Sequence, residues 1–223
     1  MAQAIFETAF DVVYLISVVA AGLIMLRRSK PGSVVQLFGL MAVVLGAGDA
    51  FHLVPRMWAL WTTGLAANVV ALGFGKLITS VTMTVFYVLL YGIWRLRYQV
   101  RGRVWLDVAV WSLAGLRVAL TLLPQNEWFS ANPPLFYGVL RNLPFAALGV
   151  LLIVLFAQEA RRTADAEFRW MWLAVTLSFA LYVPVVLLGN LWPPIGMLMV
   201  PKTLAYVWIV AMGWQLYRKG EAA

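Results

Sequence analysis

Seven apolar segments, each long enough to cross a lipid bilayer, constrain this chain more than any other feature of its sequence. A bilayer core of about 30 Å takes about 20 residues of α-helix, because each residue rises 1.5 Å. Segments of this length cover residues 5–26, 34–54, 70–94, 104–123, 136–157, 169–189 and 195–217. All seven are expected to be helices, because an open strand would leave its backbone unsatisfied in lipid. The sequence therefore predicts an all-α membrane bundle of seven helices that forms a single domain over residues 1–223.

The composition excludes most soluble classes and several kinds of chemistry. Apolar residues make up 63% of the chain and charged residues 12%, whereas soluble domains average about 45–50% and about 25%. The chain has no cysteine and one histidine, so thiol chemistry, disulfides and sites built from several histidines are excluded. No P-loop, dinucleotide-binding or G-x-S-x-G motif occurs, and no metal or other cofactor is expected.

The positive charge indicates an orientation in the membrane. The net charge of +8 would favour nucleic acid as the partner of a soluble chain, but here the basic residues lie between apolar segments, so the expected partner is the bilayer and not nucleic acid. Cytoplasmic connections are rich in Lys and Arg. One side of the predicted bundle holds 12 of the 17 basic residues: Arg27, Arg28, Lys30, Arg95, Arg97, Arg101, Arg103, Arg161, Arg162, Arg169, Arg218 and Lys219. The N-terminus is therefore expected outside and the C-terminus in the cytoplasm.

Two parts of the chain resemble each other. Met41–Gly46 and Leu173–Ser178 have similar sequences, each is followed by a proline (Pro55, Pro184), and the next segment carries a lysine (Lys76, Lys202). One interpretation is a parallel repeat of three helices, with a single helix between the two copies. The other is that apolar helices rich in Leu, Val and Ala match by chance.

Charged side chains inside the apolar segments mark the candidate site. Ionisable groups within a membrane are costly and usually face a bundle interior or a wet cavity. In six of the seven segments such a group falls at a similar depth, in the half predicted to be outside. The set comprises Glu7, Asp11, Asp49, His52, Arg56, Lys76, Arg117, Arg141 and Lys202. Five bases face three acids, so an ion-pair network alone would leave two bases without partners.

Helical spacing places these groups on common faces. Asp49, His52 and Arg56 stand at i, i+3 and i+7. In the third segment, steps of three or four residues join a polar seam: Lys76, Ser80, Thr84, Tyr87, Tyr91 and Arg95. A lipid-facing helix would not carry such a seam, so the third segment is expected at the centre of the bundle.

Three functions remain open at this point. The first is a membrane binding protein, transporter or sensor with an outward-facing cationic pocket for a small anionic solute or a lipid headgroup, coupled to protonation. Its expected ligand-binding residues are Arg56, Lys76, Arg117, Arg141, Lys202, Ser80, Thr84, Tyr87, Tyr182 and Tyr206. Proton coupling would fall to Asp49, His52, Glu7 and Asp11. The second is an intramembrane enzyme that uses Asp49 and His52 as an acid–base pair on a lipid headgroup. The third is a structural membrane protein in which the charges only pack the helices.

Several short strings resemble those of a group of bacterial seven-helix membrane proteins that carry no assigned activity. They are Gly48–Arg56, Ile78–Thr84, Pro124–Trp128 and Pro201–Lys202. The resemblance implies a bacterial inner-membrane protein and nothing about activity. A retinal protein is disfavoured, because Leu198 stands where a carboxylate would precede Lys202 by one turn and Lys76 stands in the segment that would carry acids. Zinc-dependent membrane hydrolases need several histidines and are excluded.

Overall fold

The computed structural model describes residues 1–189 and 191–220, and within them every regular element is a helix. Seven helices are long and apolar enough to span a membrane, which confirms the predicted all-α class with seven spans. Their bounds are α1 (Ala2–Arg28), α2 (Val34–Trp61), α3 (Val69–Arg97), α4 (Val104–Thr121), α5 (Leu135–Thr163), α6 (Met171–Leu188) and α7 (Met199–Arg218). Three short 3₁₀ helices lie in the connections: η1 (Ala66–Asn68), η2 (Pro124–Asn126) and η3 (Pro193–Leu198).

Helix α2 runs further than its apolar stretch predicts. It ends at Trp61 rather than at residue 54, with Pro55 inside it. Proline removes only its own N–H and so frees one carbonyl, that of Phe51, four residues earlier. A side chain at Gly75 of α3 would collide with this carbonyl oxygen and with the backbone of His52. Gly75 therefore lets α3 approach the proline-containing part of α2 closely.

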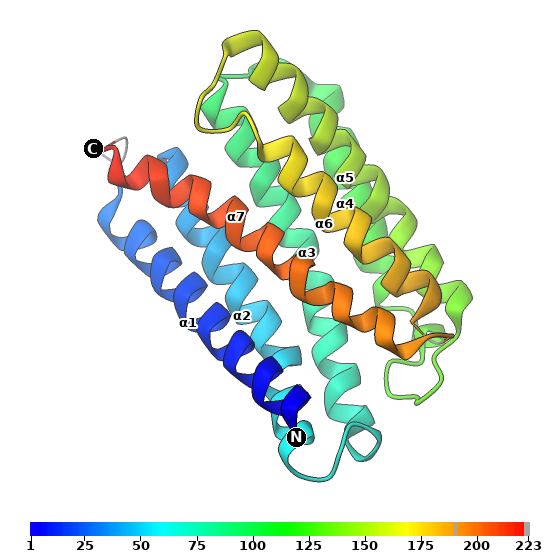
Figure 1. Ribbon diagram of the computed structural model, residues 1–223. Coiled ribbons are helices and arrows are strands. Elements are labelled where there is room, and N and C mark those ends of the chain that lie inside the picture. The colour runs from blue at the N-terminus through cyan, green and yellow to red at the C-terminus, as the bar shows by residue number, and fades with distance from the viewer. Residues whose placement is uncertain (190, 221–223) are drawn as a thin grey trace.

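The bundle has two groups of helices joined by α3 and α7. Figure 1 shows α1 and α2 on one side and α4, α5 and α6 on the other, with α3 and α7 between them. The contacts agree, since α3 touches α2, α4 and α5, while α7 touches α1, α2 and α6. The two termini lie at opposite ends of the bundle (Figure 1). We call the end where α1, α3, α5 and α7 begin the amino-terminal end.

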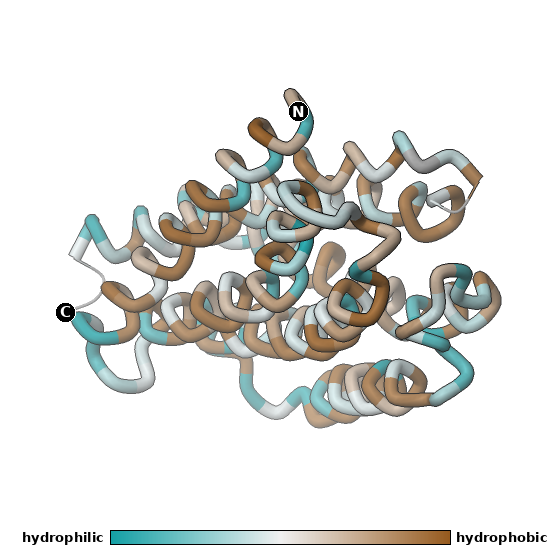
Figure 2. The backbone as a smooth tube through the Cα atoms, turned by 90° about the horizontal axis from the view of Figure 1, so that it is seen from below, coloured by the Kyte–Doolittle hydropathy of each residue, from teal (hydrophilic) through white to brown (hydrophobic). Residues whose placement is uncertain are grey.

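Large apolar side chains cover much of the outside of the bundle. In the middle of α1, Val13 and Ile16 are 69% and 65% exposed, and on α4 Val108 and Trp111 are 59% and 64% exposed. Figure 2 shows hydrophobic residues along the helices and hydrophilic residues at the helix ends and in the connections. Contiguous apolar surface of this extent marks an interaction surface, and for seven spans of this length the fitting environment is a lipid bilayer.

Small residues bring α1 and α2 into close contact. A Cβ added to Gly39 would lie 2.8 Å from the carbonyl oxygen of Gly22 and would collide with the backbone of Leu26. Small residues allow this kind of backbone approach in membrane helices. The pairing holds α1 against the helix that carries Asp49.

Ion pairs fasten the opposite, carboxy-terminal end. Arg97 at the end of α3 donates to Asp165 and Glu167 in the connection between α5 and α6, and Lys219 also pairs with Glu167. Burial raises the pKa of the Asp165 carboxyl, but the hydrogen bonds and charge of Arg97 outweigh that effect and hold this pKa below its ordinary value. On the same end Asp107 of α4 pairs with Arg95 and accepts a hydrogen bond from Tyr91.

Candidate functional site

Two cations are buried in the half of the bundle nearer the amino-terminal end. Arg117 of α4 is 2% exposed and Lys202 of α7 is 8% exposed. Among the described residues, neither has a carboxylate oxygen within 4.0 Å. Their charges are close enough to repel each other. We refer to Arg117 and Lys202 as the buried cation pair.

Neutral groups hold the Arg117 side chain. Its Nη1 donates to the Asn142 side-chain oxygen at 3.1 Å, and Tyr182 donates to the same oxygen at 3.2 Å. The guanidinium carbon lies 3.4 Å from the centroid of the Phe145 ring. Its Nε is buried and has no hydrogen-bond partner. A buried N–H of a charged group without a partner is costly, so this side chain keeps a strong donor available to a ligand.

Aromatic rings flank Lys202. Its Nζ lies 5.0 Å from the centroid of the Tyr182 ring and 4.8 Å from that of Tyr206, within the range of cation–π attraction. No hydrogen bond to its ammonium group is formed by the described residues. Three N–H donors therefore remain free at the end of a buried side chain.

Asp49 is the acid that acts on Lys202. Its charge attracts Lys202, although the two groups are too far apart for an ion pair. The Tyr14 hydroxyl donates to Asp49 Oδ2 at 2.7 Å, from α1 to α2. This hydrogen bond fixes the carboxylate on the face of α2 that looks toward α1 and α7.

A second group of charges lies nearer the amino-terminal end. Arg56 forms a two-point ion pair with Glu7, with Nε to Oε2 at 2.8 Å and Nη2 to Oε1 at 3.2 Å. Arg141 donates to the Asn126 side-chain oxygen at 2.7 Å and lies over the Trp128 ring, 4.2 Å from its centroid. Asp11 is 8% exposed and its carboxylate interacts with the charges of Arg56, Glu7 and Asp49.

Lys76 is an exposed cation at this end. It lies on the same helical stripe of α3 as Thr84 and Tyr87, which are buried inside the bundle, yet Lys76 itself is exposed. Phe74 and Val70, which are also exposed, lie on the opposite stripe. The Lys76 charge interacts with those of Arg56 and Arg141. Lys76 is therefore the solvent-accessible member of this stripe.

His52 lies close to these cations. Its Nδ1 is buried without a hydrogen-bond partner, and Lys76, Arg56 and Lys202 act on its charge. No hydrogen bond joins His52 to Asp49 among the described side chains, although both lie on one face of α2.

Aromatic side chains close the site on the side of the carboxy-terminal end. Tyr87 is fully buried, and its hydroxyl is 3.0 Å from the Ser178 hydroxyl oxygen. Rings of Phe145 and Phe179 contact Tyr87 edge-on, with centroids 4.9 and 5.4 Å away, and Phe86 joins Tyr87 to Tyr206. The Thr84 hydroxyl donates to the Ser80 backbone carbonyl. This aromatic layer separates the buried cation pair from the carboxy-terminal half of the bundle.

The nine charged residues predicted from the sequence lie close enough for their charges to interact, and Arg56 and Glu7 form an ion pair. Each one acts electrostatically on at least one other. Lys76 interacts electrostatically with Arg141, and Arg141 in turn interacts electrostatically with Arg117 of the buried cation pair. Of the polar residues expected to line the site, Tyr182 and Tyr206 contact Lys202, whereas Ser80, Thr84 and Tyr87 belong to the packed layer beyond it.

Several residues outside the predicted set of site residues position the charged groups. Asn142, Asn126 and Tyr14 bind Arg117, Arg141 and Asp49. A polar amide directly after Arg141 in an apolar segment was the signal for Asn142, and the i, i+3 spacing from Asp11 was the signal for Tyr14.

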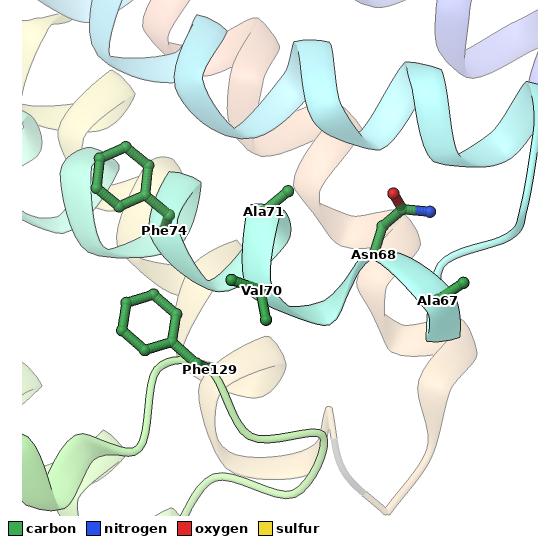
Figure 3. A pocket seen from close by; sticks show the side chains of 6 residues that line it. All are labelled: Ala67, Asn68, Val70, Ala71, Phe74 and Phe129. Atoms are coloured by element: carbon green, nitrogen blue, oxygen red, sulfur yellow. The ribbon is translucent and has the colours of Figure 1, made fainter.

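A separate hollow of about 560 Å³ lies on the outside of the start of α3. Figure 3 shows its lining side chains, with Phe74 and Val70 from α3 and Phe129 from the connection between α4 and α5. None of the nine charged residues lines it. The hollow is therefore distinct from the candidate site.

In comparisons with protein-family models, with curated proteins and with solved structures, nothing matches this chain. Within the described residues, no group of three or more Asp, Glu or His side chains could hold a metal ion.

Proposed function

We propose that this chain is an integral membrane binding protein, transporter or sensor whose cationic site binds a small anionic solute or a lipid headgroup. The proposed site lies in the half of the bundle nearer the amino-terminal end, which the distribution of basic residues predicts to be outside the cell. The resemblance to bacterial seven-helix proteins supports a place in the bacterial inner membrane.

One observation carries this proposal: two cations are buried together without a carboxylate at ion-pair distance. Burying an unpaired charge costs about 3–5 kcal/mol, and here two like charges also repel each other. An anion held between them would supply the missing charge and accept hydrogen bonds from Arg117 Nε and Lys202 Nζ. These are charge-assisted hydrogen bonds, which are the strong kind.

The position of the site supports movement as part of the function. Asp49 and Lys202 lie on α2 and α7, whereas Arg117, Asn142 and Tyr182 lie on α4, α5 and α6. An anion that contacts Lys202 and Arg117 would therefore join α7, which lies between the two groups of helices, to the group formed by α4, α5 and α6 (Figure 1). A ligand that binds α7 and this group can change their relative position, as a transporter or a sensor requires.

The two other functions have less in their favour. An acid–base pair of Asp49 and His52 would need a hydrogen bond between them or through a shared substrate, and Asp49 is instead bound by Tyr14. A purely structural role would pair buried bases with acids, and that arrangement holds for Arg56 with Glu7 but not for Arg117.

Thermal unfolding of the purified protein in neutral detergent tests the proposal. Sodium chloride, acetate, phosphate and glycerol phosphate are added at constant ionic strength to protein in a bulky sulfonate buffer. Binding to the folded state stabilises it by about 2.7 kcal/mol at a ligand concentration 100 times Kd. We expect at least one of these anions to raise the melting temperature, and Arg117→Met to abolish that increase.

Arg103→Gln is the matched control, because Arg103 is an exposed arginine at the other end of the same helix. This variant should keep the response to anions. An equal response in Arg117→Met and Arg103→Gln would contradict the proposal, as would the absence of any response in the wild-type chain. Reconstitution into bilayers with and without anionic phospholipid then distinguishes a lipid headgroup from a free solute.

A further inference from the structure

We infer that Asp49 sets the charge of the anion that this site accepts, and that it selects monovalent over divalent anions. The inference rests on the proposed function and goes beyond it, because it names the class of ligand and the residue that determines it. It follows from the arrangement of two charges, those of Asp49 and Arg117, around Lys202.

Lys202 lies between an acid and a base. Asp49 on α2 attracts its ammonium group, and Arg117 on α4 repels it. The Tyr14 hydroxyl donates to Asp49 Oδ2 at 2.7 Å, as it would to a carboxylate. With Asp49 ionised, these three residues sum to one positive charge.

Asp49 also faces other titratable groups. From α1 it faces Tyr14 and Asp11, and from α7 it faces Lys202 and Tyr206. Asp11 lies one helical turn from Glu7, and both acids interact with the charge of Arg56. For Asp49, Lys202 and Arg117 the sum is one positive charge.

A monovalent anion neutralises this part of the site, whereas a divalent anion leaves a net negative charge inside the bundle. A divalent anion can bind without that cost only if Asp49 takes up a proton from the solvent. The carboxylate then becomes a neutral carboxylic acid. The positive charge of the proton compensates for the second negative charge of the ligand. Binding of a divalent anion should therefore be accompanied by proton uptake, and binding of a monovalent anion should not.

Perchlorate and sulfate test the inference, because both are tetrahedral oxyanions and they differ in charge. Isothermal titration of the purified protein near neutral pH gives Kd for each sodium salt at constant ionic strength. The hydration of each ion is the same for every variant, so the ratio of the two Kd values is compared between variants. We expect Asp49→Asn to shift this ratio toward sulfate by at least about tenfold, which corresponds to about 1.4 kcal/mol.

Two control variants separate charge from packing. Asp49→Glu keeps the negative charge and should keep the wild-type ratio of the two Kd values. Tyr14→Phe removes the hydrogen bond to Asp49 but not the charge, so it should shift this ratio less than Asp49→Asn does. Titrations of the wild-type protein in two buffers of different ionisation enthalpy measure proton uptake. We expect about one proton for each sulfate and none for perchlorate.

The outcomes are distinct. If both anions bind and the ratio is unchanged in Asp49→Asn, or if sulfate binds the wild type without proton uptake, Asp49 does not set the charge of the ligand, and the proposed function stands. If the wild type binds perchlorate and no sulfate, the selection of monovalent over divalent anions is supported, even if Asp49→Asn does not fold. If neither anion binds and no other anion stabilises the protein, the proposed function itself fails.

Discussion

The Arg117 guanidinium lies 3.4 Å from the centre of the Phe145 ring, across the contact between α4 and α5. A cation over an aromatic face gains about 0.5–2 kcal/mol without being neutralised. Phe145 therefore helps to hold a buried positive charge in place, while the charge itself stays available to a ligand. An acid in the position of Phe145 would have neutralised the charge of Arg117.

Replacing Lys202 distinguishes a ligand site from structural packing. In Lys202→Met the cost of burying the ammonium group and its repulsion by Arg117 both disappear, so we expect the melting temperature without ligand to stay the same or to rise, and stabilisation by anions to be lost. If Lys202 mainly neutralised Asp49, the same change would leave an unpaired buried carboxylate and cost about 3–5 kcal/mol. Lys30→Met, at an exposed lysine outside the helices, is the control. A lower melting temperature together with an unchanged stabilisation by anions would show that Lys202 has a structural role and does not bind the anion.

The ion pairs of Asp165 should stabilise the fold in a pH-dependent way. Because the pKa of this carboxyl is lowered in the folded protein, its contribution is present above the unfolded pKa of about 3.9 and is lost as the pH falls through the folded value. We expect Asp165→Asn to lower the stability at pH 7 by about 1.5–3 kcal/mol, as for hydrogen bonds to charged groups. Melting curves from pH 7 to pH 3 should show the difference from wild type shrinking toward the acid end. A difference that is constant over this range would show that Asp165 does not act through its charge.

The contact between α1 and α2 should not tolerate a side chain at Gly39. Its neighbours are backbone atoms of Leu26 and Gly22, which cannot move away as a flexible side chain would. We expect Gly39→Ala to destabilise the protein by about 1–3 kcal/mol, the usual cost of overpacking. Gly115→Ala is the matched control on α4, because nothing lies within 4 Å of a Cβ added there. Equal melting temperatures for the two variants would show that α1 and α2 are not packed this closely.

The orientation in the membrane can be measured directly, because the chain contains no cysteine. Single cysteines are introduced by Ala131→Cys in the connection between α4 and α5 and by Lys30→Cys in the connection between α1 and α2, both at exposed positions. The excess of basic residues at the second connection predicts that an impermeant maleimide labels Ala131→Cys in intact bacterial cells. Lys30→Cys should react only after the cells are permeabilised. The reverse pattern would place the amino-terminal end of the bundle, and the proposed site with it, on the cytoplasmic side.

The order of apolar and polar residues was enough to predict the seven helices, since span length and hydropathy are local properties of the chain. The same holds for the shared faces of charges such as Asp49 and Arg56, because the 3.6-residue period fixes which residues of one helix lie together. The predicted end of α2 was wrong, because a proline inside a helix removes one hydrogen bond without ending the helix. Beyond the predicted end, α2 continues as a helix next to the close contact between Gly75 of α3 and the backbone of α2.

The partners of the charges depended on the tertiary structure. Tyr14 and Asp49 are 35 residues apart, and Arg97 and Asp165 are 68 apart, so no local pattern relates them. Glu7 neutralises Arg56, whereas Phe145 and Asn142 hold Arg117 without neutralising it. This difference depends on how each helix is rotated and on which helix lies beside it. Those rotations are set by the fit of side chains across every helix contact at once, and the sequence of a single helix does not contain that information.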